Sequence, residues 1–296
     1  MIKLNLTQLK YFKAVGIYQS VSMAAEYLHI SQPSLSSAIK DLEDEFGIQL
    51  FKRTHKGMIL TNEGNELLER ATKLMSHAEA VERVMQDMGN RKKSLHLGIP
   101  PMIGSLVLSK ILGDFSVANP DITLDITEGG RSELLNLADD GLIDMLILPH
   151  YDSFDSRFDV LRIGQVETAC CVSIKSPLSK LSTIQPSDLM HSPIVLFKNS
   201  FFQTELILNW FSKSNISPNI VIQSSQLSTI ENLVASGNGA GFMFKELTKE
   251  NQKIKAISLN NPLKLDVSLV WKKQSVVFSS MKRFYNYVKN TSLLAK

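Results

Sequence analysis

The chain has 296 residues, of which 44% are hydrophobic and 21% are charged, and its formal net charge is +3. This composition is typical of an ordinary globular protein long enough for two or three domains, and the small net charge does not by itself indicate a nucleic-acid-binding protein. Neither an N-terminal signal pattern nor an apolar stretch of membrane-spanning length is present, so we expect a cytoplasmic protein with no membrane partner.

The first 47 residues predict three helices. Apolar residues at helical spacing predict the first over residues 6–16, and a serine cap predicts the second over residues 21–28. After a short turn, Ser31 can cap a third helix that carries Pro33 in its first turn and ends at Gly47. Helix, short turn and helix form the outline of a helix-turn-helix.

The two faces of the third helix differ. One face carries a stripe of apolar residues for packing: Leu35, Ile39, Leu42 and Phe46. The other face gathers short or flexible hydrogen-bonding side chains toward its N-terminal end: Gln32, Ser34, Ser36, Ser37 and Lys40. Such groups can contact base edges and phosphates, so this face is typical of a helix that enters a DNA major groove. An ordinary helical hairpin with a solvated serine face is the alternative.

Residues 48–61 contain two short apolar runs separated by a basic turn that ends at Gly57, a pattern that predicts a hairpin, or wing. Lys52, Arg53 and Lys56 lie toward its tip, where they can contact phosphates beside the inserted helix. A solvated loop is the alternative interpretation of these three basic residues.

Residues 6–64 resemble the DNA-binding domain of the LysR-type transcriptional regulators. The resemblance rests on a long series of positions: Ala24, Ala25, the run from Ser31 to Ser36, Ile39, Leu42, Glu43, Phe46, Gly47, Leu50, Phe51, Arg53, Leu60, Thr61 and Gly64. It implies that the groove is faced by Gln32, Pro33, Ser34, Ser36, Ser37 and Lys40. It also implies that Arg53 and Lys56 contact the DNA backbone or minor groove, and that the protein is a homotetramer of two dimers.

Residues 62–88 predict one long helix of roughly 40 Å. Its apolar residues alternate spacings of four and three, as in a heptad seam: Leu67, Ala71, Leu74, Ala78, Val81, Met85 and Met88. A second copy of the helix is the expected partner, giving a two-fold dimer with two DNA-reading heads. Packing against the rest of the same chain is the alternative. Residues 89–93 then form a polar hinge.

From residue 94 onward the pattern changes to alternating strands and helices. Strands are expected over residues 95–99, 122–127, 145–148, 168–174, 194–197, 220–223, 241–244 and 265–271, and helices over residues 105–115, 132–140, 202–214, 227–236 and 278–289. Such alternation predicts a parallel sheet covered by helices. This part is similar to the effector-binding domain of the same family, which implies two α/β subdomains like those of a periplasmic binding protein. The chain is expected to cross between them near residues 164–165 and 266–267.

Four loops lie where ligands of open α/β sheets bind, between a strand end and a helix start: residues 100–105, 129–132, 199–204 and 224–226. The candidate effector-binding residues are Pro101, Met102, Ile103, Gly104, Arg131, Ser132, Ser200, Phe201, Phe202, Gln203 and Ser225. Arg131 can supply a counter-charge, so we expect a small carboxylate or similar anionic metabolite. Met102 stands where family members often have Ser or Thr, so the first loop is expected to contribute shape more than hydrogen bonds. Plain turn chemistry is the alternative for each loop.

Cys170 and Cys171 are adjacent on an expected strand, and the simplest interpretation is two small buried apolar groups. A redox-sensing regulator is the alternative. The six histidines lack metal-ligand spacing, and no nucleophile elbow or paired-carboxylate motif is present, so we expect neither a metal, nor a cofactor, nor an enzyme.

The expected fold is α/β with an all-α N-terminal part. Residues 1–61 form a winged helix-turn-helix, residues 62–89 a dimerisation helix, and residues 90–296 an effector domain with subdomain I at 94–163 and 268–296 and subdomain II at 164–267. The expected function is that of a regulator that binds double-stranded DNA at a partly palindromic operator in response to a small effector. A solute-binding or enzymatic α/β protein with a helical assembly domain is the remaining alternative.

Overall fold

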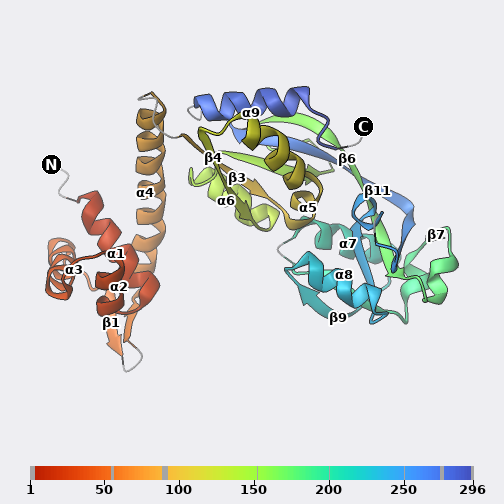
Figure 1. Cartoon of the computed structure of the whole chain (residues 1–296). Helices are drawn as coiled ribbons and strands as arrows, with labels where there is room; N and C mark the ends of the chain where they lie inside the picture. The colour runs from red at the N-terminus through yellow and green to blue at the C-terminus, as the bar shows by residue number, and fades with distance from the viewer. Residues whose placement is uncertain are drawn as a thin grey trace. The chain divides into compact units, whose positions relative to one another are not determined.

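The computed structural model describes residues 4–54, 57–88, 93–151, 153–199, 201–249, 251–273 and 277–294. The chain divides into two compact units, Met1–Arg83 and Val84–Lys296 (Figure 1). Among the helices in these ranges, none combines the length and apolar character that crossing a membrane requires.

The first unit has the three predicted helices, the hairpin and most of the long helix. Its elements are α1 (Leu6–Tyr18), α2 (Val21–Tyr27), α3 (Gln32–Phe46), β1 (Phe51–Thr54), β2 (Gly57–Leu60) and α4 (Asn62–Met88). Side chains of Asn5, Ser20 and Ser31 accept hydrogen bonds from the first turns of α1, α2 and α3, which explains where these helices begin. Gly47 ends α3 with φ +64°, a conformation that glycine adopts without strain.

The core of this unit joins all three short helices to the hairpin. Phe12, Ala24, Leu35, Leu42 and Leu50 are fully buried in it. The hairpin strands pair antiparallel from Phe51 opposite Leu60 to Thr54 opposite Gly57. The winged helix-turn-helix is therefore confirmed for the described residues.

Only part of the predicted seam of α4 packs inside its own chain. Leu67 and Leu68 contact the core of the first unit and Ala71 is buried, so own-chain packing accounts for the first turns. Leu74 and Val81 further along the helix are 48% and 63% exposed. That half of the seam is left uncovered in a single chain.

The second unit is built on one mixed sheet of nine strands within the described residues, in the order β4-β3-β5-β11-β6-β10-β8-β9 with β7 beside β11. The strands are β3 (Lys93–Ile99), β4 (Ile122–Glu128), β5 (Met145–His150), β6 (Phe158–Ser173), β7 (Thr183–Ile184), β8 (Pro193–Phe197), β9 (Asn219–Ser224), β10 (Ala240–Phe244) and β11 (Ile254–Lys272). The helices are α5 (Pro101–Lys110), continued by a π-helix over Ile111–Ser116, then α6 (Arg131–Asp139), α7 (Phe202–Ser212), α8 (Leu227–Ala235) and α9 (Ser279–Asn290).

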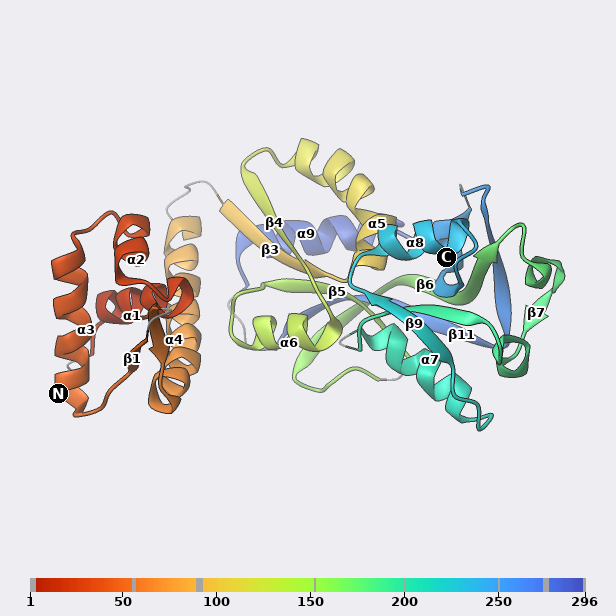
Figure 2. The same cartoon turned by 90° about the horizontal axis from the view of Figure 1, so that it is seen from below.

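Two long strands hold this sheet together. At one end of the sheet, β3 pairs parallel with both β4 and β5, and at the other end β8 pairs parallel with both β9 and β10. Between these two ends, β6 and β11 pair antiparallel with each other and with their outer neighbours (Figure 2). Gly164 on β6 lies opposite Val267 on β11, and the pairing shifts between Val267 and Ser268. This irregularity coincides with the region where the sequence predicts the chain crossings.

Three predictions of extent were wrong. The strand expected over residues 168–174 is only the second half of β6, and that expected over 265–271 is only the second half of β11. Charged residues in the missed halves, such as Arg162 and Lys264, interrupt the apolar pattern and so conceal the strands. The helix expected from residue 105 begins at Pro101, since a proline is well tolerated in a first helical turn.

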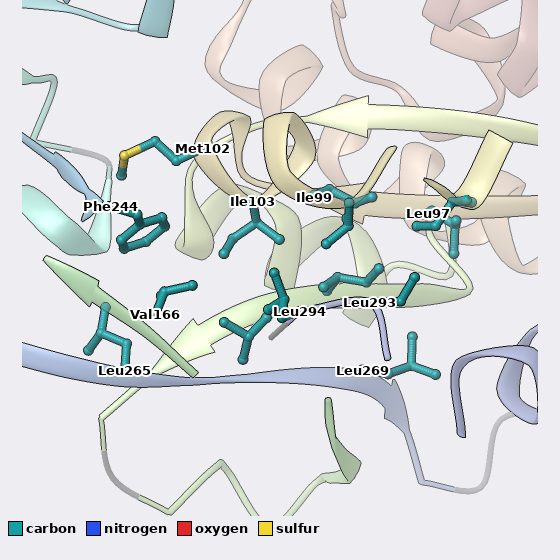
Figure 3. Packing of buried hydrophobic residues seen from close by; sticks show 14 of the residues in the cluster. Leu97, Ile99, Met102, Ile103, Val166, Phe244, Leu265, Leu269, Leu293 and Leu294 are labelled. Carbon is teal, nitrogen blue, oxygen red and sulfur yellow. The ribbon is translucent and has the colours of Figure 1, made fainter. Parts of the chain in front are cut away.

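The principal core of the second unit joins both ends of the sheet. Leu97, Ile99, Val166 and Leu265 are buried in one cluster with residues of α5 (Figure 3). Ile103 points from α5 into the middle of this cluster, and Met102, which belongs to the same cluster, projects from the start of α5 near Phe244 (Figure 3).

Candidate nucleic-acid interface and effector cleft

The front of α3 is open to solvent. Gln32, Pro33, Ser34, Ser37 and Lys40 are exposed, and Ser36 is half-buried. The apolar stripe of the same helix is buried except for Phe46. All six side chains that the sequence assigns to the DNA groove are thus accessible in the first unit.

Local hydrogen bonds orient two of these side chains. The Ser34 backbone N–H donates to the Ser31 Oγ at 3.3 Å, and the two hydroxyls lie 2.7 Å apart. The Ser22 hydroxyl on α2 donates to the Gln32 Oε1 at 3.0 Å. Because this bond engages the amide oxygen of Gln32, the N–H groups of the same amide stay available to donate to another partner.

A groove of about 730 Å³ runs between α3 and β1. Its lining combines residues from both elements: Val21, Ser36, Ile39, Lys40, Glu43, Gln49, Phe51, Lys52, Arg53 and Met58. The structure therefore brings the predicted Ser36, Lys40 and Arg53 together on one basic surface. Lys56 lies outside the described residues.

Glu43 is a residue whose role the sequence analysis missed. Its Oε1 accepts the backbone N–H groups of Leu50 at 2.7 Å and of Phe51 at 3.1 Å. These are the residues at which the chain enters β1, so one carboxylate joins α3 to the base of the wing. Charge-assisted bonds of this kind are stronger than neutral ones.

In the second unit, α5, α6, α7 and α8 follow strands and begin without a side-chain capping bond. The N-cap residues of α5, α6 and α7 are Pro100, Gly130 and Phe201, and none of them makes a side-chain capping bond. Since the first N–H groups of a helix have no intrahelical acceptor, these three starts retain donors for an anion.

Arg131 is the first residue of α6 and is held by three neighbours. Its Nη1 donates to the Pro149 carbonyl at 2.9 Å, and its guanidinium carbon lies 4.7 Å from the ring centre of Phe154 and 5.0 Å from that of Phe202. Burial lowers the pKa of Arg131, and the negative charge of Glu205 opposes that shift. An arginine remains protonated in such surroundings, so the cleft has a fixed positive charge.

Two adjoining hollows surround this guanidinium. The inner one measures about 20 Å³ and is lined by Pro100, Pro101, Met102, Arg131, Pro149, Phe197, Phe201, Phe202, Gln203, Phe244 and Leu265. The outer one measures about 450 Å³ and is lined by Arg131, Ser132, His150, Tyr151, Ser153, Asn199, Phe202, Glu205 and Leu206. Arg131 and Phe202 belong to both hollows.

The cleft thus gathers most of the predicted effector-binding residues. Those that line it are Pro101, Met102, Arg131, Ser132, Phe201, Phe202 and Gln203. Ile103 lies in the core and Gly104 is buried within α5, because the helix starts earlier than expected. Ser225 is exposed and lines neither hollow, and Ser200 lies outside the described residues.

Several lining residues were missed because they belong to strands. Phe197 and Phe244 end β8 and β10, and His150 ends β5. The effector-binding residues were predicted in loops, whereas an apolar residue at a buried strand end cannot be told from an ordinary core residue in the sequence. The Nε2 of His150 also lies 2.9 Å from the Ser268 hydroxyl oxygen, within hydrogen-bond distance.

Two family models match this chain. The one described as "Bacterial regulatory helix-turn-helix protein, lysR family" matches residues 6–65, and the one described as "LysR substrate binding domain" matches residues 89–292. The chain belongs to the LysR family. It is a DNA-binding transcription regulator with an effector-binding domain, and the family is one of regulators, not of enzymes.

Relatives of this LysR-type regulator extend over most of its length. The "Uncharacterized HTH-type transcriptional regulator YwbI" of Bacillus subtilis (strain 168) is 26% identical over 294 residues, covering 97% of this chain and 96% of that protein. The "Hydrogen peroxide-inducible genes activator" of Haemophilus influenzae is 25% identical over 241 residues, covering 81% and 80%. Full-length CbnR complexed with its target DNA has the same fold, with a TM-score of 0.72 at 20% identity and coverage of 97% of this chain and 99% of that one.

The cysteines of this LysR-type regulator differ from what a peroxide sensor needs. Cys170 and Cys171 are both fully buried. Burial raises the pKa of Cys171 to about 12 and also raises that of Cys170. Because the thiolate is the form that reacts with an oxidant, these positions favour the interpretation of two inert core residues.

Proposed function

We propose that this LysR-type regulator binds a partly palindromic operator through α3 and the wing, and that a small anionic metabolite in the cleft controls the binding. The observation that supports the effector site most directly is that residues from separate loops meet at one place in the cleft. Arg131, Phe202 and Gln203 come from two distant loops and meet beside helix starts that lack caps. A partly buried arginine near free N–H groups is suited to a carboxylate.

For DNA, we assign the major-groove contacts to Gln32, Pro33, Ser34, Ser36, Ser37 and Lys40, and contacts to the backbone or minor groove to Arg53 and Lys56. The accessibility of the front of α3 supports the first group, and the basic groove that Lys40 shares with Arg53 supports the second. Side chains that reach base edges determine sequence preference, and cations on phosphates determine salt dependence.

For assembly, we propose a homodimer through α4 and a tetramer of two such dimers. The exposed apolar half of the seam supports the dimer, since a long helix with a narrow apolar stripe needs a partner. Two copies of α3 would then address two half-sites of the operator. We place this assembly in the cytoplasm, where its DNA partner is found.

We also propose the domain boundaries as residues 1–61, 62–89 and 90–296, with subdomain I at 94–163 and 268–296 and subdomain II at 164–267. The shift in strand pairing near Val267, opposite Gly164, supports a boundary there. Closure of the two subdomains on the effector would shift the population of DNA-bound arrangements.

Selection of genomic fragments by the purified full chain tests the first part of this proposal. The expected result is enrichment of sites with related half-sites, and a chain that selects no sequence over random fragments would refute it. Metabolites of the pathway beside the selected site are then screened by thermal shift. A metabolite that stabilises wild type and the Arg131→Ala variant equally would refute the assigned effector site.

A further inference from the structure

One residue in the wall of the inner hollow has a buried hydrogen-bond donor that lacks a partner in the described part of the chain. Gln203, in the first turn of α7, is 6% exposed and lines this hollow. Its Nε2 has no hydrogen-bond partner among the described residues. Because buried amide groups are nearly always hydrogen-bonded, the side chain indicates an acceptor that enters from outside the chain.

Arg131 provides a second donor on the same hollow. One of its guanidinium nitrogens donates to the Pro149 carbonyl, and its guanidinium carbon lies over the rings of Phe154 and Phe202, so its other N–H groups can donate to a ligand. The uncapped start of α7, at Phe201, adds backbone N–H groups beside Gln203. The donors of Gln203, Arg131 and α7 all suit an oxygen anion.

The two hollows differ in size, so each fits a different part of a ligand. The inner hollow of about 20 Å³ holds a group of the size of one water molecule, such as a carboxylate oxygen. The outer hollow of about 450 Å³ lies within the usual range of small-molecule sites, about 300–1,000 Å³. Phe202, Tyr151 and Leu206 line the outer hollow, so they offer flat and apolar surfaces to the body of the ligand.

The charges that face the hollows limit the ligand to one anionic group. The titratable residues that line them within the described parts of the chain are Arg131, Glu205, His150 and Tyr151. Glu205 is exposed in the wall of the outer hollow, and its charge already acts on Arg131. A second carboxylate on the body of the ligand would meet this like charge.

We infer that the effector of this regulator is a flat, apolar monocarboxylate, held by Arg131 and Gln203 at the inner hollow with its ring in the outer one. The inference rests on the proposed effector site and adds the class of ligand, the recognition role of Gln203 and the discrimination by Glu205. A ligand without the ring loses contact with Phe202, and one with a second carboxylate is repelled by Glu205.

Calorimetric titration of the full chain with benzoate, acetate, phthalate and inorganic phosphate tests the inference. We expect benzoate to bind at least roughly tenfold more tightly than the other three, because only benzoate combines an apolar ring with a single carboxylate. Gln203→Leu, which is similar in size, should weaken benzoate roughly tenfold. The matched control Gln252→Leu, at an exposed position outside both hollows, should bind benzoate as wild type does.

Glu205→Gln gives a second test that does not depend on the buried position. It should reduce the preference for benzoate over phthalate several-fold while leaving benzoate affinity close to that of wild type. Thermal unfolding and operator binding of each variant show whether it is folded. If Gln203→Leu is folded and binds benzoate as wild type does, a water molecule satisfies Gln203 and the inference is overturned.

The proposed function can survive failure of this inference. If neither benzoate nor the larger aromatic monocarboxylates phenylacetate and cinnamate bind, but succinate or phosphate changes operator binding through Arg131, the ligand class is wrong and the effector site stands. If no small anion binds the full chain and no operator is selected, the proposed function fails as well.

Discussion

Replacement of Glu43 by alanine should disconnect the wing from α3. The Glu43 carboxylate accepts two hydrogen bonds, at 2.7 and 3.1 Å, from the backbone N–H groups of Leu50 and Phe51 at the entrance to β1. Hydrogen bonds to charged groups contribute about 1.5–3 kcal/mol each when buried. Because Glu43 is only half-buried and shares one oxygen between both donors, we expect Glu43→Ala to lower the free energy of unfolding by about 2 kcal/mol.

The effect on DNA binding should appear in the salt dependence. Lys52 and Arg53 lie on β1, directly after the anchored residues. If both contact phosphates, loss of their placement removes up to two contacts, and the slope of log K against log salt becomes shallower by roughly 0.9 for each. Fluorescence anisotropy of a labelled duplex between about 50 and 200 mM salt measures this slope.

A matched variant separates anchoring from charge. Glu45 is exposed on the same helix, so Glu45→Ala removes an equal charge without removing a bond to the wing. Glu43→Gln keeps an acceptor oxygen and should recover part of the lost slope. Equal slopes for Glu43→Ala and Glu45→Ala would refute the reasoning, since the effect would then be one of net charge.

Three further predictions concern other parts of the chain. Arg53→Ala should weaken binding to all DNA and reduce the salt slope by about 1, whereas Gln32→Ala should chiefly relax base preference, by about 1–3 kcal/mol at one position, as measured with a set of operator variants. Val81→Asp, in the exposed half of the α4 seam, should abolish the α4 dimer contact and give a smaller assembly than wild type in sedimentation, without lowering the melting temperature of the first unit's core. Cys171 is fully buried and its pKa is raised to about 12, so native protein should react with a thiol reagent no faster than it unfolds; labelling within seconds would contradict this burial.

The helices of the first unit could be predicted from the sequence because their ends depend on local chemistry. Ser31 and Gly47 define both ends of α3 through a cap and a left-handed backbone, which depend on neighbouring residues only. The role of Glu43 could not be read in this way. An acidic residue on a helix is ordinarily a solvated surface charge, and its two acceptor bonds exist only because the chain returns to it seven and eight residues later.

Some residues of the cleft were likewise predictable from the sequence, and others were not. Arg131 and Gln203 lie at helix starts that follow strands, so the position of each in its loop was predictable. Phe197 and Phe244 reach the inner hollow through the order of the strands, since β8 and β10 pair with each other. The start of α5 was predicted wrongly because two consecutive prolines indicate a loop as readily as a first helical turn.

The topology of the sheet explains why a ligand in this cleft can act on the conformation of the second unit. Arg131 begins the helix after β4, and Gln203 lies in the helix after β8, so the two donors belong to opposite ends of the sheet with β6 and β11 between them. If the proposed carboxylate binds both donors, it would join these ends directly. In the middle, Asp266 on β11 accepts hydrogen bonds from Arg162 at 2.8 Å and Gln165 at 3.2 Å on β6. The effector can shift the equilibrium between two arrangements only by its difference in affinity for them, about 1.4 kcal/mol for each tenfold change. Loss of one of the two donors should therefore reduce the response to ligand at saturation, in addition to weakening the binding itself.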